Sequence, residues 1–170
     1  MPSFMTITIR VRSYHKSFLT AIYGVEPLSF PRKDDFNRIL NLLLTNNPPE
    51  YSAYDRSDVN LEIRLPFFED KDVRSYFHLS PTREKILFDK IDDLFKIVFR
   101  DEMDQYTTMG VAVHTAVRLF MENYRLSEDT FDMLVKDYNR TKVRRRVKKT
   151  RDRKNISSVK SRFCPKPDLL

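Results

Sequence analysis

The sequence is poor in glycine and cysteine, and each shortage excludes a class of functional site. Only two of the 170 residues are glycine, Gly24 and Gly110, so neither of the glycine-based phosphate-binding patterns, G-x-x-x-x-G-K and G-x-G-x-x-G, is present. The single cysteine, Cys164, excludes an intramolecular disulfide framework and a cysteine-rich zinc site. Phosphate-binding loops, disulfides and zinc fingers are therefore not the basis of this protein's fold or function.

Long apolar runs are absent as well. No uncharged stretch is long enough to span a membrane, and no charged segment leads into an apolar one in the manner of a signal peptide. We therefore expect a soluble protein of the cytoplasm with no membrane partner.

Residues that could support catalysis are few and scattered. The three histidines, His15, His78 and His114, stand far apart, and none has a metal-type partner two to four residues away. Adjacent acids on helices are expected mostly to face solvent, and the pairs here are Asp34–Asp35, Asp92–Asp93 and the group Asp101, Glu102 and Asp104. Asp34–Asp35 stand where the N-terminus of a helix would favour negative charge. We therefore expect no catalysis, no cofactor and no metal. Acids from Asp89 to Asp104 gathered with His114 in a cleft would instead indicate an enzyme acting on nucleic acid.

Positive charge is concentrated at the C-terminal end of the chain. The whole chain carries 31 Lys and Arg against 24 Asp and Glu, a net charge of +7. From Lys136 to Leu170 there are 14 Lys and Arg against three Asp, a net charge of +11, which leaves −4 for residues 1–135. Such asymmetry is typical of a folded body with an arm that binds a polyanion.

The densest basic stretch, residues 142–154, is the strongest functional signal. Clustered Lys and Arg bind nucleic-acid backbones because they neutralise phosphates and release condensed counterions. The alternatives are a solvated tail that aids solubility and a tail that docks on an acidic protein surface. We favour nucleic acid, and the expected phosphate contacts in this stretch are Lys142, Arg144, Arg145, Arg146, Lys148, Lys149, Arg151, Arg153 and Lys154, with Arg140 just before it.

Alternation of apolar and polar residues predicts β-strands in the first half of the chain. Residues 5–11 and 59–65 both alternate with a period of two, which is typical of half-buried strands. A third strand is expected around residues 73–77. Residues 14–23 fit either a short helix or a strand.

Apolar residues at helical spacing predict several helices. The first runs over residues 33–45, and Asn46 to Pro49 end it. A second begins after Ser80 and Pro81, which cap and start it, and continues to about Met103. A third covers residues 107–124 with Met109 on its buried face, and a fourth is capped by Ser127 and buries Phe131, Leu134, Val135 and Tyr138.

These elements indicate an α+β fold, in which a β-containing N-terminal half packs with a helical C-terminal half of three helices. We expect one domain over residues 1–138, β-rich over 1–79 and helical over 80–138. We expect residues 139–170 to form a basic, partly disordered arm.

The stretch from Val117 to about Arg140 resembles the general helix-turn-helix pattern. Ser127 stands at the expected cap of the second helix, and the apolar offsets are occupied by Phe120, Tyr124, Leu126, Phe131 and Leu134. Two positions depart from the pattern, because Met121 replaces the usual small residue and Arg125 the usual turn glycine. From this hairpin, Arg125 and Lys136 could add phosphate contacts.

Acidic residues weaken the comparison with a DNA reader. Glu128, Asp129 and Asp132 open the second helix, whose N-terminal residues would have to enter the major groove beside the phosphates. A structural hairpin of two packed helices explains the same pattern equally well.

Together these observations predict a non-enzymatic protein with an accessory or regulatory role that binds nucleic acid, DNA rather than RNA, through its basic arm. The alternative is a structural or assembly component of a phage particle or a ribonucleoprotein, whose extended tail docks into a partner and orders only when bound.

Overall fold

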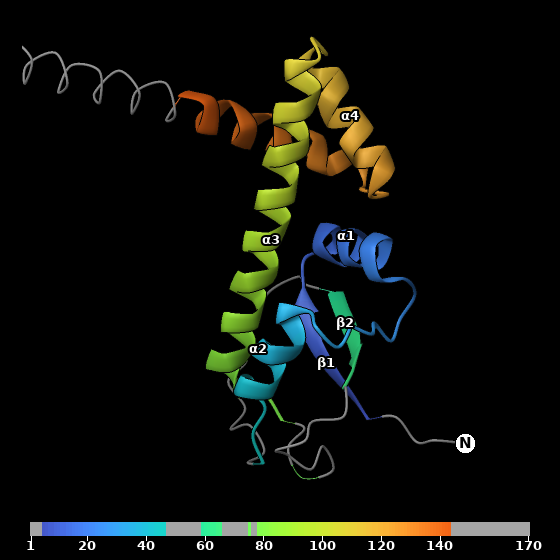
Figure 1. Cartoon of the computed structure of the whole chain (residues 1–170), viewed down its shortest axis with the longest axis vertical. Coiled ribbons are helices and arrows are strands. Elements are labelled where there is room, and N and C mark those ends of the chain that lie inside the picture. The colour runs from blue at the N-terminus through green and yellow to red at the C-terminus, as the bar shows by residue number, and fades with distance from the viewer. Residues whose placement is uncertain (1–4, 47–58, 66–74, 76–77, 144–170) are drawn as a thin grey trace, which may run out of the picture.

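The computed structural model describes residues 5–46, 59–65, 75 and 78–143 (Figure 1). Within them the elements follow one another in this order: β1 (Thr6–Val11), α1 (Ser13–Tyr23), α2 (Asp35–Leu43), β2 (Val59–Arg64), α3 (Pro81–Thr108), α4 (Val113–Asn123), the single-turn 3-10 helix η1 (Glu128–Thr130) and a helix over residues 131–143. The mixed α and β content expected from the sequence is confirmed.

The two strands form an antiparallel pair with their apolar residues on one face. The register places Ile7 opposite Ile63 and Ile9 opposite Leu61, and all four side chains are buried. Leu28 extends the outer edge of β2, because its N–H donates to the carbonyl of Glu62 at 2.8 Å. Both strands predicted from alternation are therefore confirmed. The third strand expected around residues 73–77 lies outside the described residues, except for Ser75, which is in a turn.

The segment over residues 14–23, which the sequence left open between helix and strand, is the helix α1. Its buried residues, Tyr14, His15, Phe18 and Leu19, fall on one helical face, and Gly24 ends it at a φ of +93°. The helix predicted over residues 33–45 is confirmed as α2. Asp34 caps it, because its carboxylate accepts the backbone N–H of Phe36 at 2.8 Å.

The 28-residue helix α3 is the longest element and contacts both parts of the protein. Ser80 and Pro81 begin it as predicted, and the Ser80 hydroxyl accepts the N–H of Arg83 at 3.4 Å. One buried row runs along it, consisting of Leu87, Ile91, Phe95, Phe99 and Met103. In Figure 1 the sheet, α1 and α2 lie beside its first half, and α4 and the 131–143 helix lie beside its second half.

Aromatic rings fill the region where these two parts meet. Phe95 lies 5.1 Å from Phe18 of α1 and 5.9 Å from Phe120 of α4, measured between ring centroids, with both pairs edge to face. Edge-to-face pairs at this separation add stabilisation beyond the burial of their area. Because Phe95 touches rings from both sides, α3 joins the first and second halves of the chain through one continuous core.

The boundary predicted between the next two helices is wrong. The sequence placed residues 107–124 in one helix with Met109 buried, whereas α3 continues to Thr108, α4 begins at Val113 and Met109 is 73% exposed. Gly110 explains the break, because its φ of +84° cannot be part of a right-handed helix.

The last predicted helix is present but begins differently. Ser127 stands at the N-cap position of η1, yet its side chain makes no capping hydrogen bond. Its carbonyl instead accepts the backbone N–H of Thr130 at 3.1 Å, which forms the 3-10 turn that precedes the 131–143 helix. Among the described helices, none is both long and apolar enough to cross a membrane.

Replacing Gly110 by Ala tests the origin of the α3–α4 turn. No atom lies within 4 Å of a Cβ built there, so the cost arises from backbone conformation and not from a clash. We expect Gly110→Ala to lower the free energy of unfolding by about 1 kcal/mol, measured by urea denaturation. Met109→Ala, at the exposed neighbouring position, should leave it nearly unchanged; an equal loss in both variants would contradict this explanation.

Candidate nucleic-acid interface

Four of the predicted phosphate-contacting residues are described, and all four are exposed: Arg125, Lys136, Arg140 and Lys142. The remaining eight, Arg144, Arg145, Arg146, Lys148, Lys149, Arg151, Arg153 and Lys154, lie outside the described residues. The described part of the candidate interface therefore lies mainly on the 131–143 helix.

Two buried residues fix the 131–143 helix against α3. Leu134 is 1% exposed and Tyr138 is 4% exposed. The Tyr138 hydroxyl donates to the carboxylate of Asp104 at 3.2 Å, and its ring centroid lies 6.4 Å from that of Phe99. Arg100 also reaches this helix, through an ion pair with Asp137 at 3.4 Å. The helix is thus held by both apolar and polar contacts.

The same contacts determine which side chains face solvent. Lys136 and Arg140 lie one helical turn apart on the exposed side, and the Lys142 ammonium lies 5.9 Å from the centre of the Tyr138 ring. Figure 1 shows the helix passing behind α3, with its C-terminal end emerging on the far side of α3 from α4.

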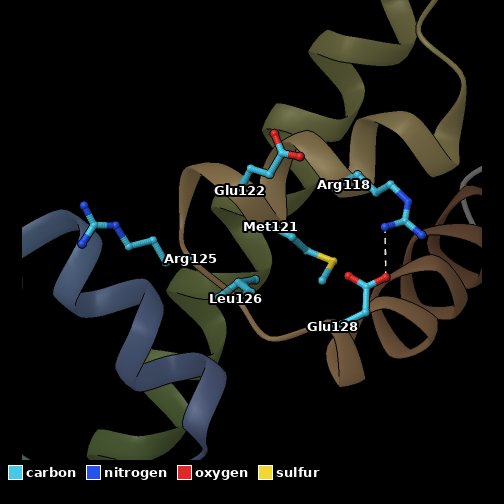
Figure 2. Close-up of a pocket in the computed structure, with 6 residues that line it drawn as sticks. All are labelled: Arg118, Met121, Glu122, Arg125, Leu126 and Glu128. Atoms are coloured by element: carbon cyan, nitrogen blue, oxygen red, sulfur yellow. Dashed lines mark hydrogen bonds and ion pairs between the residues drawn. The ribbon is translucent and has the colours of Figure 1, made fainter.

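Arg125 lies apart from these three residues, in the turn after α4. Its φ of +52° is in the left-handed region, which explains why the helix-turn-helix pattern usually has glycine at this position. Figure 2 shows its side chain pointing away from Arg118 and Glu128, on the side of α1. The structure therefore brings Lys136, Arg140 and Lys142 onto one helix but does not bring Arg125 to them.

The N-terminal end of the hairpin's second helix is acidic, as the sequence indicated. Glu128, Asp129 and Asp132 are exposed, and Glu128 pairs with Arg118 of α4 at 2.9 Å (Figure 2). The Arg118 guanidinium also lies 4.7 Å from the centre of the Phe131 ring. These contacts stabilise the hairpin, while the exposed carboxylates would repel phosphates at this end.

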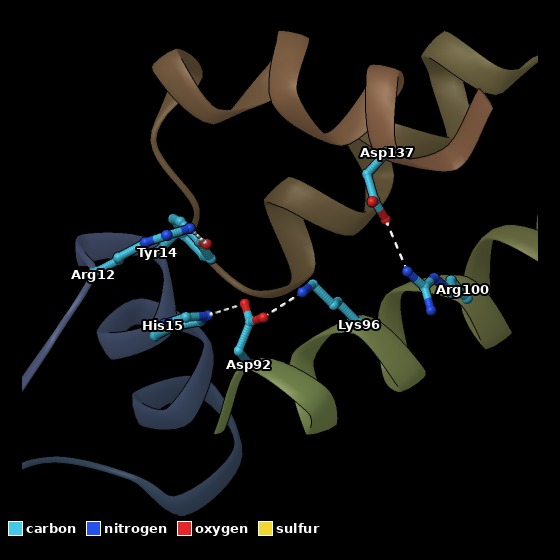
Figure 3. Close-up of polar contacts among 7 residues, drawn as sticks. All are labelled: Arg12, Tyr14, His15, Asp92, Lys96, Arg100 and Asp137. Carbon is cyan, nitrogen blue, oxygen red and sulfur yellow. Dashed lines mark hydrogen bonds and ion pairs between the residues drawn. The ribbon is translucent and has the colours of Figure 1, made fainter. Parts of the chain in front are cut away.

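A polar cluster at the junction of α1, α3 and the 131–143 helix was missed by the sequence reasoning (Figure 3). His15 is fully buried, and its Nε2 lies 3.2 Å from the Asp92 carboxylate. The other oxygen of that carboxylate forms an ion pair with Lys96. The expectation that Asp92 and Asp93 both face solvent is therefore wrong for Asp92, and correct for Asp93.

The hydrogen bond with His15 lowers the pKa of Asp92 to about 2. Burial alone would raise this pKa, and the ion pair with Lys96 lowers it further. The i, i+4 spacing of Asp92 and Lys96 could have identified the ion pair from the sequence. Nothing local could have identified His15, which lies 77 residues away and is held in place by the rings of Tyr14, Phe88 and Phe95.

Other acids singled out in the sequence have structural partners. Asp34 caps α2 and accepts the hydroxyl of Tyr23 at 2.9 Å, as expected of an acid at a helix N-terminus. Glu102 accepts the hydroxyl of Tyr124, so the expectation that it faces solvent is wrong. Burial and this carboxylate raise the pKa of Tyr124. Asp104 accepts the Tyr138 hydroxyl, so it too departs from the expected solvent-facing role.

The histidines do not assemble a metal centre within the described part of the chain. His114 is exposed, with its ring 5.8 Å from that of Phe131. His78 pairs through its backbone with Thr45, at 2.9 and 3.1 Å. In the ranges that the structure describes, no group of three or more His, Cys, Asp or Glu is placed to hold a metal ion.

Comparison with known proteins gives no relative: no family model, no curated protein and no solved structure matches this chain.

Asp92→Asn tests the role of the buried cluster. Because the pKa of Asp92 is lowered in the folded protein, the stabilisation is complete above about pH 4, the value for an unfolded chain, and is lost as the pH falls towards 2. We expect the variant to lose about 1–2 kcal/mol of unfolding free energy at pH 7, and the difference from the wild type to narrow below pH 4. Chemical denaturation across this range measures both effects.

The adjacent Asp93→Asn variant is the control, since Asp93 is exposed. It removes the same charge from the same turn of α3 and should change the stability by a few tenths of a kcal/mol at most. A loss in Asp92→Asn that does not depend on pH would contradict the assignment.

Proposed function

We propose that this protein binds nucleic acid, DNA rather than RNA, through the C-terminal end of the 131–143 helix and the basic stretch that follows it. One observation carries the proposal: Lys136, Arg140 and Lys142 are exposed on the described part of this helix, and residues 144–154, which follow in the sequence, contain eight further Lys and Arg. The role we propose is an accessory or regulatory one in the cytoplasm, and it needs no catalytic group.

The physical basis is the attraction of clustered cations for phosphates. Each phosphate neutralised by Lys or Arg releases condensed counterions, so affinity falls steeply as salt rises. Contacts of this kind hold and orient a protein on the nucleic acid but carry little sequence information. We therefore expect binding with weak sequence preference.

The distribution of charge along the hairpin supports one direction of approach. Glu128, Asp129 and Asp132 are exposed at the start of the second helical segment, and the exposed cations are at its end. A nucleic acid would approach the end that carries Lys136 and Arg140 and avoid the acidic end. In this arrangement the hairpin positions the basic stretch, and Arg125 contributes at most a separate contact.

A salt titration tests the proposal with the full-length chain and a labelled duplex of random sequence. The variant Lys136→Gln/Arg140→Gln/Lys142→Gln should bind more weakly, and the slope of log K against log salt should decrease by about 0.9 for each phosphate that is no longer neutralised. A second variant with the eight Lys and Arg of residues 144–154 replaced by Gln should lose nearly all binding. RNA of the same sequence should bind less tightly.

The matched control removes three exposed charges from another surface, in Lys33→Gln/Lys85→Gln/Lys90→Gln. It has the same net charge as the helix variant and should bind like the wild type. Equal losses in the two triple variants would show a general effect of net charge instead of an interface. No binding by the wild-type chain at moderate salt would overturn the proposal and favour the alternative, an assembly component whose basic tail docks into a partner.

A further inference from the structure

Four side chains on the solvent side of α3 form one row, which we call the α3 row: Ile86, Lys90, Asp93 and Ile97. All four are exposed, and the two isoleucines are 42% and 57% exposed. Within the residues that the structure describes, neither Lys90 nor Asp93 forms an ion pair. The α3 row is therefore open to solvent, on a helix whose opposite side is in the core.

The spacing of the α3 row is that of a helix-pairing surface. Its members are four, three and four residues apart, which is the interval at which side chains line the seam between two paired helices. They cover about 16 Å of the helix, at 1.5 Å per residue. Single exposed isoleucines are ordinary, but here two stand in line with opposite charges between them. The row thus offers both apolar contact and charge to a second helix.

The order of the residues makes the α3 row complementary to itself. Ile86 and Ile97 are equally far from the midpoint between residues 91 and 92, and so are Lys90 and Asp93. In a second α3 that lies antiparallel, with a two-fold axis at this midpoint, Ile86 stands opposite Ile97 of the second copy. Lys90 then stands opposite Asp93 of the second copy. The two-fold axis makes each of these contacts occur twice.

The charges also select the antiparallel direction. In a parallel pair about a two-fold axis along the helices, Lys90 would meet Lys90 of the second copy, and Asp93 would meet Asp93 of the second copy. Like charges placed opposite each other suppress a pairing, whereas opposite charges fix its direction and register. Only the antiparallel pair combines both isoleucine contacts with attraction between the charges.

The cations beyond the isoleucines do not oppose this arrangement. Arg83 and Arg100 would come near each other across the pair, but each is engaged within its own chain. The Arg83 guanidinium donates to the carbonyl of Leu43 at 2.9 Å, and Arg100 forms its ion pair with Asp137 at 3.4 Å. Neither guanidinium is therefore an uncompensated charge at the ends of the α3 row.

The exposed cations of the 131–143 helix are also kept apart. This helix packs against α3 beyond Ile97, at Phe99 and Asp104. In an antiparallel pair the two copies of this region lie at opposite ends. Lys136 and Arg140 of one copy are therefore remote from those of the other, and their charges do not counteract the pairing.

We propose that two copies of this chain pair antiparallel through the α3 row, about a two-fold axis at the middle of α3. A stable interface buries about 1,200–2,000 Å², and a row of four residues on each copy is much smaller. The dimer is therefore weak and forms only at high protein concentration. This pairing does not depend on the proposed function, because it involves none of the residues expected to contact phosphates.

Sedimentation equilibrium of the full-length chain, from micromolar to submillimolar concentration, tests the proposal. The average mass should rise with concentration, from the 20.4 kDa of one chain towards twice that value. A mass that stays at 20.4 kDa at every concentration would overturn the proposal.

Charge reversal identifies the surface and its direction. Lys90→Asp and Asp93→Lys should each weaken dimerisation by about tenfold, because each replaces two attractive contacts by two repulsive ones. The double variant Lys90→Asp/Asp93→Lys exchanges the charges and should restore dimerisation to within a few-fold of the wild type. A double variant as weak as either single variant would contradict the antiparallel pairing.

The matched control is Lys85→Asp, which makes the same change at an exposed position of α3 outside the row. It should dimerise like the wild type, and equal weakening in Lys85→Asp and Lys90→Asp would overturn the assignment of the surface. Ile86→Ala/Ile97→Ala should also weaken dimerisation at least tenfold, because it removes the apolar contacts. The thermal midpoint of each variant, measured on the dilute monomer, shows that the fold is kept.

Discussion

The row of buried side chains along α3 is the feature on which the rest of the structure depends. Phe95 lies at its middle, with rings of α1 on one side and of α4 on the other. Burying a side chain of this kind contributes about 1.5–3 kcal/mol. A two-stranded sheet alone is marginal in water, so β1 and β2 rely on being packed against this helix. The hairpin that presents the exposed cations depends on it equally, through Phe120, Leu134 and Tyr138.

In the second half of the chain, the acids that contact neighbouring helices are partly buried, whereas the cations near its described end are exposed. Partly buried acids connect the helices. Asp104 accepts a hydrogen bond from the Tyr138 hydroxyl, and Asp137 forms an ion pair with Arg100. The cations of the last helical turns remain exposed. Partly buried pairs of this kind add positional accuracy more than stability. The chain thus uses its partly buried charges to orient one helix, while the cations further along that helix stay exposed.

Much of the secondary structure could be predicted from the sequence, because it follows from short-range periodicity. The alternation of Ile7 and Ile9 with polar neighbours identified β1, and the spacing of Leu87, Ile91 and Phe95 identified α3. The sequence was misleading or ambiguous in two places. Gly110 stopped α3 within a stretch whose apolar spacing continued, and residues 14–23 fitted two periods until packing against α3 selected the helix.

For the candidate site too, some residues could be identified from the sequence and others could not. Lys136, Arg140 and Lys142 could be found from the sequence, because a dense basic stretch needs no tertiary structure to be recognised. The polar cluster could not be found, because His15 and Asp92 become neighbours only when α1 packs on α3.

The pairing of β1 with β2 also determines the order in which the chain can fold. Val11 pairs with Val59, and Thr6 pairs with Arg64. Each residue pair of the sheet therefore closes a long loop, and closing that loop costs conformational entropy. The α3–α4 hairpin closes through the short turn at Gly110 and is a local structure. Local helical pairs form faster than strand pairs between distant segments. We therefore expect the helical hairpin to form before the sheet, and β1, the first of these elements to be synthesised, has no partner in the core until β2 and α3 have been made.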